Sequence, residues 1–413
     1  MRHEQQDHGQ SVSADRQDDS DFLGAQSDAL SDAIARHLQL TYEPLNRKSL
    51  RMFQTPEAAA ILGIQPGYFR TLQSDGKIES PHRSEGNRRV YSLDDINSIR
   101  DQLESRARSK GFYKRGRSEN GGDKLSVICT ASFKGGSGKS TTAIHIISSL
   151  AFRGYKVLSI DLDPQSSLTS IMGYQSEYDF RDSGTIYDAL RYDDPVTISS
   201  ILQPTCFPNV SIAPAGLILS EFDHETPMAL RNNIEPAFHS RLATALADVE
   251  SDFDVVIIDT PPALSFLTLS AMSASNGIIM PVVPNMLDIA SFSMFLRMTS
   301  DLLKSIEKAQ NIKVNFDFIR VLISRHEPQS SAQQETVGFI RSLLKDMVME
   351  STVLKSSVIA DASMENKTVH EVYPRDYHRD TYKRARDSVD AAMDEIEFLV
   401  QTKCWGREWG DRT

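Results

Sequence analysis

The sequence predicts an α/β protein whose body is a doubly wound, mainly parallel sheet, preceded by a smaller helical domain. Short apolar runs recur through residues 125–323, three of them ending in an acid or a proline, with helix-like segments between the runs. A glycine-rich loop follows the first of these runs, and the chain before residue 124 has helical spacing instead. Strands that alternate with helices favour a parallel sheet with helices on both faces.

Length and composition set the outer bounds. The 413 residues are enough for two or three domains, and 40% hydrophobic residues suffice for a sizeable core. Cys129, Cys206 and Cys404 are far apart and have no metal-binding spacing, which fits a reducing cytoplasm. No apolar stretch approaches the ~18 residues of a membrane span. Residues 1–24 lack the apolar core of an export signal and are expected to be a disordered tail.

The net charge of −11 is unevenly distributed along the chain. Between Asn46 and Arg117 there are 15 Lys or Arg residues and 8 Asp or Glu residues, a net charge of +7 that leaves −18 for the rest. A basic module on an acidic body indicates a segment that faces DNA.

This basic module, residues 46–104, has the pattern of a winged helix-turn-helix. Thr55, followed by proline, begins a short Ala-rich helix as its N-cap, and a second helix begins near Gln65. Residues 81–92 then predict a hairpin, and residues 93–103 return to helical spacing. The order of these elements resembles the winged helix of MerR-type DNA-binding domains.

In such a domain the second helix enters the major groove and the wing grips the phosphate backbone. The candidates for DNA contact are Gln65, Tyr68, Arg70 and Gln73 near the second helix and Arg83, Arg88 and Arg89 in the wing. A small helical dimerisation or docking domain with a solvated basic face remains the alternative.

Two segments flank the module. Residues 25–45 predict an N-terminal helix with an apolar face that could build a dimer. The apolar residues on that face are Leu30, Ala33, Ile34 and Leu38. Residues 105–123 form a basic linker, with six basic residues and no acidic one between Ser105 and Arg117. We interpret the linker as a hinge, either with side chains that contact phosphate or simply solvated.

The most informative segment is the glycine-rich loop between the first apolar run and a helix. Its residues are Lys134, Gly135, Gly136, Ser137, Gly138, Lys139, Ser140 and Thr141. Backbone N–H groups and the positive end of the helix converge on an anion in such a loop, while Lys139 adds a mobile charge and Ser140 a hydroxyl for Mg²⁺. The loop therefore predicts a nucleotide phosphate site, and a turn that only packs is the plain alternative.

The spacing of this loop departs from the usual phosphate-binding motif, because Phe133 stands where that motif has glycine. The form K-G-G-x-G-K-[ST] resembles the deviant Walker A box of the ParA/MinD ATPases. The resemblance implies that Lys134 reaches across a nucleotide sandwich dimer to the phosphates of the partner.

Two later apolar runs end in acids, the first in Asp161 and Asp163 and the second in Asp259. The carboxyl ends of parallel strands line the ligand crevice, so we expect Asp161 and Asp259 to address Mg²⁺ together with Ser140. By resemblance to ParA proteins, Asp163 positions or activates the attacking water. Each acid could instead cap the element that follows it.

Two more runs extend the sheet. Residues 277–283 predict a strand whose following loop lies over the nucleotide, and residues 318–323 predict another that leads to Arg325. Arg325 could meet phosphate or purine, or serve as a surface ion-pair partner. Residues 379–400 form a helix with an apolar face that we expect to cover the sheet.

Taken in order, the winged helix and the boxes K-G-G-S-G-K-S-T, D-L-D-P-Q, I-I-D-T-P-P and V-P-N-M-L-D resemble the RepA type of ParA partition ATPases of RepABC replicons, over about residues 27–400. The resemblance implies an ATPase domain at residues 124–402, followed by a tail at residues 403–413. It also implies ATP and Mg²⁺ as cofactors and a homodimer that binds nucleoid DNA in the cytoplasm.

The same resemblance implies slow basal hydrolysis that a ParB-type centromere-binding partner stimulates, and autorepression through the winged helix. The candidates for contact with nonspecific DNA are Lys355, Lys367 and Arg375.

Three rival classes were weighed against this interpretation. A MinD-like membrane regulator needs a basic amphipathic helix at its end, whereas residues 391–400 are acidic. An iron–sulfur reductase needs further cysteines placed as cluster ligands. A transcriptional repressor gated by ATP or ADP, with no role in segregation, stays open, although Asp163 favours hydrolysis.

Overall fold

The computed structural model describes residues 21–27, 29, 30, 33, 48–79, 84, 85, 88–108, 110–118, 122–180, 183–310 and 313–409. The chain divides into two compact units, residues 1–49 and 50–413. In the first unit, residues 21–27, 29, 30 and 33 are helical, so helix is present before the expected boundary at residue 25. Ile34 and Leu38 of the expected apolar face lie outside the described residues.

The second unit begins with a small α/β module. Its elements are β1 (Phe53–Gln54), α2 (Thr55–Ile61), α3 (Pro66–Ser74), β2 (Ser84–Glu85), β3 (Arg88–Tyr91) and α4 (Leu93–Arg106). β3 pairs antiparallel with both β1 and β2. The N-cap of α2 is Gln54 rather than the expected Thr55, because pairing with Val90 keeps Gln54 extended and its N–H donates to Glu57 Oε2 at 2.9 Å.

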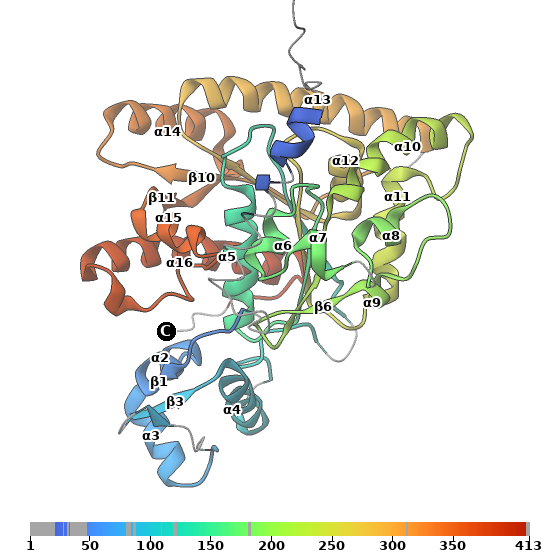
Figure 1. Ribbon diagram of the computed structural model, residues 1–413. Helices are drawn as coiled ribbons and strands as arrows, with labels where there is room; N and C mark the ends of the chain where they lie inside the picture. The colour runs from blue at the N-terminus through green and yellow to red at the C-terminus, as the bar shows by residue number, and fades with distance from the viewer. Residues whose placement is uncertain are drawn as a thin grey trace, which may run out of the picture. The chain divides into compact units, whose positions relative to one another are not determined.

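The main sheet has eight strands in the order β11-β10-β9-β4-β8-β5-β7-β6. Figure 1 shows β11 and β10 on the left of the body and β6 on the right. The strands are β4 (Ser126–Thr130), β5 (Val157–Asp161), β6 (Gln203–Pro204), β7 (Val210–Ala213), β8 (Val255–Asp259), β9 (Gly277–Val282), β10 (Phe318–His326) and β11 (Val348–Leu354). All neighbouring pairs are parallel except β6 with β7. This confirms the predicted mainly parallel sheet.

The longer helices of this body are α5 (Lys139–Phe152), α10 (Ser220–Arg231), α11 (Phe238–Leu246), α12 (Phe266–Ala274), α13 (Met286–Gln310), α14 (Ser331–Leu344), α15 (Ser357–Met364) and α16 (Arg379–Leu399). The shorter helices and turns are α6 (Ser167–Ile171), α7 (Ser176–Asp179), α8 (Ile186–Leu190), α9 (Ile198–Ile201), η1 (Leu217–Leu219), η2 (Ala247–Val249), η3 (Lys345–Met347), η4 (Pro374–Asp376) and η5 (Val400–Cys404).

Both faces of the sheet are buried, which explains why its strands are continuous apolar runs rather than alternating ones. Along β8, Ile257 joins a core with α5, α15 and α16, while Val256 and Ile258 join a core with α10 to α14. The predicted cover of the sheet by residues 379–400 is confirmed, because α16 packs against β11 and α5.

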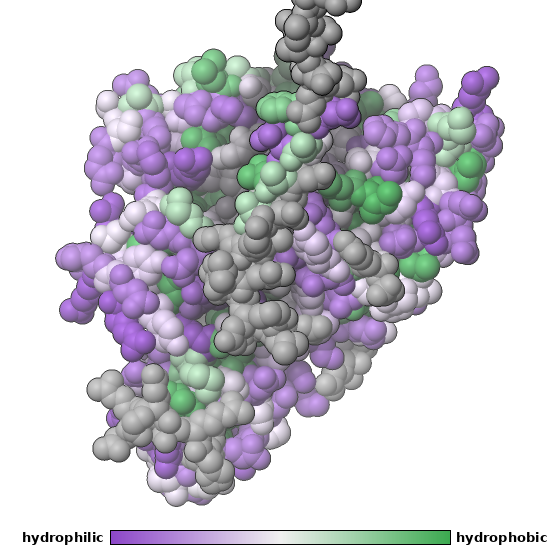
Figure 2. Space-filling model, viewed as in Figure 1, coloured by the Kyte–Doolittle hydropathy of each residue, from purple (hydrophilic) through white to green (hydrophobic). Residues whose placement is uncertain are grey.

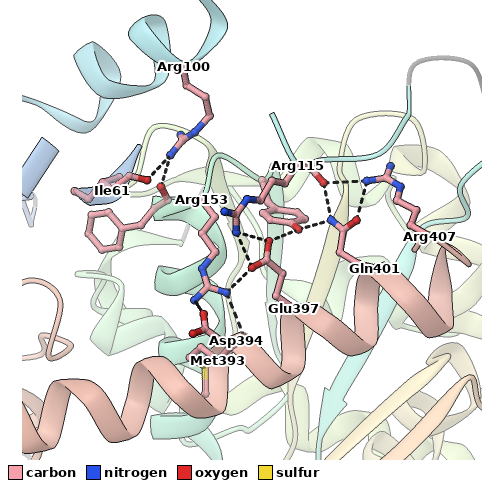
Figure 3. Close-up of polar contacts among 11 residues, drawn as sticks. Ile61, Arg100, Arg115, Arg153, Met393, Asp394, Glu397, Gln401 and Arg407 are labelled. Carbon is pink, nitrogen blue, oxygen red and sulfur yellow. Dashed lines mark hydrogen bonds and ion pairs between the residues drawn. The ribbon is translucent and has the colours of Figure 1, made fainter. Parts of the chain in front are cut away.

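The small module shares the first of these cores with α5. Arg100 of α4 is 3% exposed and donates to the carbonyl oxygen of Phe152, the last residue of α5, at 2.5 Å. Figure 3 shows this guanidinium between Ile61 and the end of α5. A Cβ on Gly154 would lie 2.6 Å from Arg100 Nη1, so glycine is needed for this approach. The module is thus fastened to the helix that begins at the glycine-rich loop.

The basic linker is not the hinge that its composition suggested. Glu397 of α16 is 1% exposed and accepts from Arg115 at 3.0 Å and from Arg153 at 2.7 Å (Figure 3). Arg117 donates to the carbonyl oxygen of Phe253 at 3.0 Å. Although burial raises it, Arg153 and Arg115 bring the pKa of Glu397 below its usual value. The acidic body therefore binds linker arginines that we had considered for phosphate.

The expected tail at residues 403–413 is also part of the body as far as residue 409. Trp405 is 8% exposed, stacks on Tyr155 with ring centroids 6.1 Å apart and donates to the carbonyl oxygen of Lys124 at 2.9 Å. Arg407 donates to the carbonyl oxygen of Gly116 at 3.0 Å. These contacts, which span almost 300 residues of sequence, hold the chain end against the linker.

The face of the molecule in Figure 2 is largely hydrophilic, with apolar side chains in small separate patches. Such scattered exposure is ordinary for a globular protein. Within the described part of the chain, no helix is both long enough and apolar enough to cross a membrane.

Candidate nucleotide-binding site

The glycine-rich loop connects β4 to the start of α5 at the carboxyl edge of the sheet. Gly136 and Gly138 have φ angles of 76° and 91°, in the left-handed region that strains other residues. α5 begins at Lys139 directly after this turn. The unpaired N–H groups of its first turn and its positive end make this position suited to an anion.

Neighbouring residues brace the loop. The hydroxyl groups of Ser132 and Ser137 lie 2.5 Å apart, and Ser324 Oγ donates to the carbonyl oxygen of Ser137 at 2.8 Å. Arg325, for which the sequence left two roles open, donates from Nη1 to the carbonyl oxygen of Gly136 at 3.3 Å. The end of β10 therefore supports the loop, a role that residue spacing did not indicate.

Lys139 is the central cation of the site. It is 6% exposed, and burial lowers its pKa, while the carboxylates of Asp259 and Asp163 oppose this shift. Lys139, Asp163 and Asp259 thus form a compact cluster of charges. The ammonium group of Lys139 can bind an anionic phosphate through charge-assisted hydrogen bonds.

Asp259, at the end of β8, fits a divalent cation. It is fully buried, and Oδ1 accepts from Thr130 Oγ1 at 3.2 Å. Oδ2 is buried and has no hydrogen-bond partner within the described ranges. Burial raises the pKa of Asp259, and contacts with Ser140 and Lys139 oppose this. An unsatisfied carboxylate oxygen beside the Ser140 hydroxyl is a donor set suited to Mg²⁺.

Asp161 has a different set of partners. Its Oδ2 accepts from the N–H and the hydroxyl of Thr169 at 2.8 and 2.7 Å, and its Oδ1 accepts from the N–H of Asp163 at 3.1 Å. Both oxygens are therefore used to order the loop after β5. The expectation that Asp161 ligates the metal is not supported by these contacts, which leave Ser140 and Asp259 as the favoured pair.

Asp163 lies close to the cluster and is 7% exposed. Its Oδ1 accepts from the N–H of Gln165 at 3.0 Å. Burial raises the pKa of Asp163, and Lys139 opposes this shift. Such a carboxylate is placed to hold a water molecule in the crevice.

Lys134 pairs with an acid on another element. Its side chain is 54% exposed and forms an ion pair with Asp288, on the first turn of α13. Asp288 was quoted as part of the V-P-N-M-L-D box but had no predicted role. The pattern Asn285-x-x-Asp288 at a helix start was the signal available, since such residues cap helices.

The candidate DNA contacts lie on several elements. Gln65, Tyr68 and Arg70 are exposed at α3, and Gln73 donates to the Tyr91 hydroxyl at 2.8 Å. Arg89 is exposed on β3 and donates to Gln73 Oε1 at 3.4 Å. Arg83 lies outside the described residues, and of Arg88 only the backbone, in β3, is described.

The three candidates for nonspecific DNA contact are exposed but already paired with acids. Lys355 lies 3.0 Å from Glu327, Lys367 lies 2.8 Å from Glu365, and Arg375 lies 3.9 Å from Asp376. Exposed pairs of this kind are weak, so phosphate could replace the acids.

The iron–sulfur alternative finds no ligand set. The three cysteines are free thiols, and within the described part of the chain no three or more His, Cys, Asp or Glu side chains are grouped to hold a metal ion.

The fold and the site define a P-loop protein with a ParA-like ATPase fold. A family model described as an AAA domain matches residues 125–316. A solved partition protein covers 92% of this chain and 99% of its own with a TM-score of 0.63 at 14% identity. A Cyanothece McdA solved in complex with ATP covers 66% and 97% with a TM-score of 0.53 at 21% identity.

Proteins with similar sequences identify the family within this class of P-loop proteins. A Rhizobium rhizogenes protein named as a replication protein A is 41% identical over 92% of this chain and 94% of its own. A protein of the same name from Sinorhizobium fredii is 39% identical over 94% and 95%. The Escherichia coli protein SopA is 27% identical over 79% and 82%. The chain belongs to the RepA family of ParA-type ATPases.

Proposed function

We propose that this protein is a Mg²⁺-dependent ATPase that segregates a low-copy plasmid or secondary replicon by switching between a DNA-bound ATP dimer and a released state. The family supports the partition role, since the relatives include a protein named for chromosome partitioning in Myxococcus xanthus. A structural neighbour that is 23% identical, a cobyrinic acid a,c-diamide synthase, was solved with an ATP analogue and magnesium.

The observation that carries the proposal is the buried cluster of Lys139, Asp163 and Asp259 beside the glycine-rich loop. Lys139 and the N–H groups of α5 bind the phosphates, and the cluster excludes most water from them. Ser140 and Asp259 hold Mg²⁺, which neutralises phosphate charge when bound. Asp163 orients the attacking water through its carboxylate, so positioning and charge, rather than a covalent intermediate, accelerate hydrolysis.

Basal turnover is proposed to be slow, because a protein whose nucleotide state times DNA residence needs a partner to complete its site. Lys134, half-exposed at the loop, is proposed to contact phosphates across a homodimer. A ParB-type protein is proposed to stimulate hydrolysis and release the protein from nucleoid DNA.

The module of β1 to α4 is proposed to be a winged helix that binds an operator and represses the protein's own operon. Its support is the pair α2 and α3 followed by the β2–β3 hairpin, with Tyr68 half-exposed on α3. Lys355, Lys367 and Arg375 are proposed to meet nonspecific DNA once their acidic neighbours are displaced.

The test is ATP hydrolysis by the purified protein, alone and with sheared duplex DNA and its cognate ParB-type protein. We expect low basal activity, stimulation by both additions together and loss of activity in Asp163→Ala. Turnover near 10 per second by the protein alone would contradict a partner-timed switch.

The second candidate is a repressor gated by ATP or ADP that has no segregation role. It is supported by the direct contact of Arg100 with the end of α5, which connects the module of β1 to α4 with the helix that begins at the glycine-rich loop. Undetectable hydrolysis in every mixture, together with operator binding that depends on ATP or ADP, would select this function.

A further inference from the structure

The segment between α15 and η4 is a loop whose middle is buried. Residues 368–372 are all buried, whereas the side chains of Lys367 and Arg375 on either side are 42% and 71% exposed. A loop in the interior is unusual, because its backbone N–H and C=O groups need partners there. The carbonyl oxygen of Val369 accepts from the Tyr382 hydroxyl of α16 at 3.4 Å. The N–H of the same residue is satisfied from the other side, by α5.

His145 of α5 is the partner of that N–H. The N–H of Val369 donates to His145 Nε2 at 3.4 Å, and His145 Nδ1 lies 2.6 Å from the carbonyl oxygen of Thr141. A neutral ring that carries its proton on Nδ1 satisfies both contacts, because Nδ1 then donates to Thr141 and Nε2 accepts from Val369. Burial favours this neutral form, since it lowers the pKa of His145. One side chain therefore connects the last residue of the glycine-rich loop with the buried segment.

His370, the next residue of the segment, is held by both helices. Its Nδ1 lies 3.3 Å from Ser148 Oγ of α5, and its Nε2 lies 2.7 Å from Asp390 Oδ1 of α16. Arg386 donates from Nε to the other oxygen of Asp390 at 2.8 Å. The rings of His145 and His370 have centroids 6.1 Å apart. The segment is thus fixed to α16 at one side and to the first turns of α5 at the other.

We propose that His145 is a positioning residue for DNA binding, because it attaches the segment that carries Lys367 and Arg375 to the helix that binds the phosphates. Nucleotide at the glycine-rich loop orders the first turn of α5, and the contacts of His145 with Thr141 and Val369 transmit this order to the buried segment. The two cations are then held in place before they meet DNA phosphates, which lowers the cost of binding. This inference rests on the nucleotide-gated DNA binding of the proposed function and adds the residues that connect the two sites.

The experiment measures binding of a fluorescein-labelled DNA duplex of arbitrary sequence by anisotropy, with Mg²⁺ alone and with Mg²⁺ and the non-hydrolysable analogue AMPPNP. It compares wild type with His145→Asn and His145→Gln. Asparagine keeps an N–H near the position of Nδ1 for Thr141 but leaves Val369 without an acceptor, whereas glutamine places an oxygen near the position of Nε2 and keeps that acceptor. We expect the gain in DNA affinity caused by AMPPNP to fall about five- to tenfold in His145→Asn, the effect of one lost hydrogen bond at a buried group, and to survive in His145→Gln.

The two variants separate positioning from packing. Both remove the imidazole ring, so a role in packing alone would affect them equally. In His145→Asn the affinity for AMPPNP without DNA should equal that of wild type, because the contact with Thr141 is kept. His224→Asn, which alters an exposed histidine of α10, is the control and should keep the full gain. An equal gain in His145→Asn and wild type would show that His145 does not connect the two sites.

Hydrogen exchange of the wild-type protein gives a second measurement that needs no variant. The amide groups of residues 366–376 should exchange more slowly with Mg²⁺ and AMPPNP than with Mg²⁺ alone. Unchanged exchange in this segment while AMPPNP binds would overturn the inference. A wild-type DNA affinity that does not respond to AMPPNP would instead refute the switch of the proposed function, on which the inference rests.

Discussion

Two carboxylates that pair in register across β5 and β8, Asp161 and Asp259, illustrate how partners decide a residue's role. Both are fully buried at strand ends, and sequence spacing made them equivalent metal ligands. Thr169 and the N–H of Asp163 occupy the two oxygens of Asp161, whereas Asp259 keeps one oxygen without a partner within the described residues. The first carboxylate stabilises a loop and the second is available to a cation.

Asp161→Asn should therefore lower stability without changing the Mg²⁺ requirement. The amide leaves at least one of the donors from Thr169 or Asp163 unsatisfied, which costs about 1–3 kcal/mol in the free energy of unfolding. Urea unfolding measures this loss, and binding of a fluorescent ATP analogue at increasing Mg²⁺ measures the cation requirement. Asp259→Asn is expected to raise the Mg²⁺ concentration needed for binding. If Asp161→Asn raised that concentration and Asp259→Asn did not, this division of roles would be wrong.

His370 should make the protein sensitive to mild acid. Burial, with Arg386 adding to it, lowers the pKa of His370 to about 3, while Asp390, which lies 2.7 Å from Nε2, opposes the shift. In the unfolded chain the pKa of this histidine is near 6.5. Between pH 3 and pH 6.5 the unfolded chain therefore binds a proton at His370, whereas the folded chain does not. The stabilisation is complete above pH 6.5 and falls as the pH is lowered, by about 2 kcal/mol at pH 5.

The measurement is the difference in urea midpoint between pH 7 and pH 5. His370→Asn should reduce that difference, whereas His224→Asn, which alters an exposed histidine, should preserve it. An unchanged difference in His370→Asn would assign the acid sensitivity to other groups.

At the scale of elements, α5 makes different contacts at its two ends. Its first turn lies at the phosphate cradle, and its last carbonyl group, that of Phe152, accepts from Arg100 of α4. A cation at the carboxyl end of a helix also complements the helix dipole. The module of β1 to α4 is therefore attached to the nucleotide site through one helix.

Arg100→Met should loosen this attachment. Methionine can fill the apolar part of the site, but the carbonyl of Phe152 loses its donor inside the protein, which costs about 1–3 kcal/mol. Faster hydrogen exchange in residues 93–106 than in wild type is the expected result, with ATP binding retained. Arg106→Ala removes an exposed arginine from the same helix and is the control. Equal exchange in Arg100→Met and wild type would show that the apolar core alone holds the module.

The elements that the sequence predicted well are those whose signal is local. The strands after residues 125, 156 and 254 were recognised from apolar runs, because strands buried on both faces leave no alternation to misread. α5 begins at Lys139, inside the loop motif, so the end of the motif forms the first turn of the helix.

The failures were contacts between distant positions. Glu397 binds Arg115 from 282 residues away, and nothing near either residue signals this pairing. A run of basic residues has the same composition whether it faces DNA or binds buried acids. The contacts of the linker and of the chain end were therefore not predicted for one reason, which is that burial of charge is decided by the whole fold.

For the molecule as a whole, the chain end holds the linker against the body; we call this contact the clasp. Trp405 lies against Tyr155, whose hydroxyl donates to Glu397 at 2.7 Å, and Glu397 in turn binds Arg115. This series of contacts connects the segment between α5 and β5, α16 and the linker. Removing one of these side chains should therefore weaken the attachment of the linker.

Trp405→Ala is expected to destabilise the protein and expose the linker to proteases. Removing a buried indole leaves a cavity and costs about 3–5 kcal/mol, and the carbonyl of Lys124 also loses its donor. Limited trypsin digestion should cleave the variant within residues 105–118 much faster than wild type, because arginines there lose their buried partners. Lys403→Ala, an exposed residue in the same turn, should resist like wild type. Cleavage at wild-type rate in Trp405→Ala would mean that Glu397 secures the linker without the chain end, and the clasp would then reduce to α16 alone.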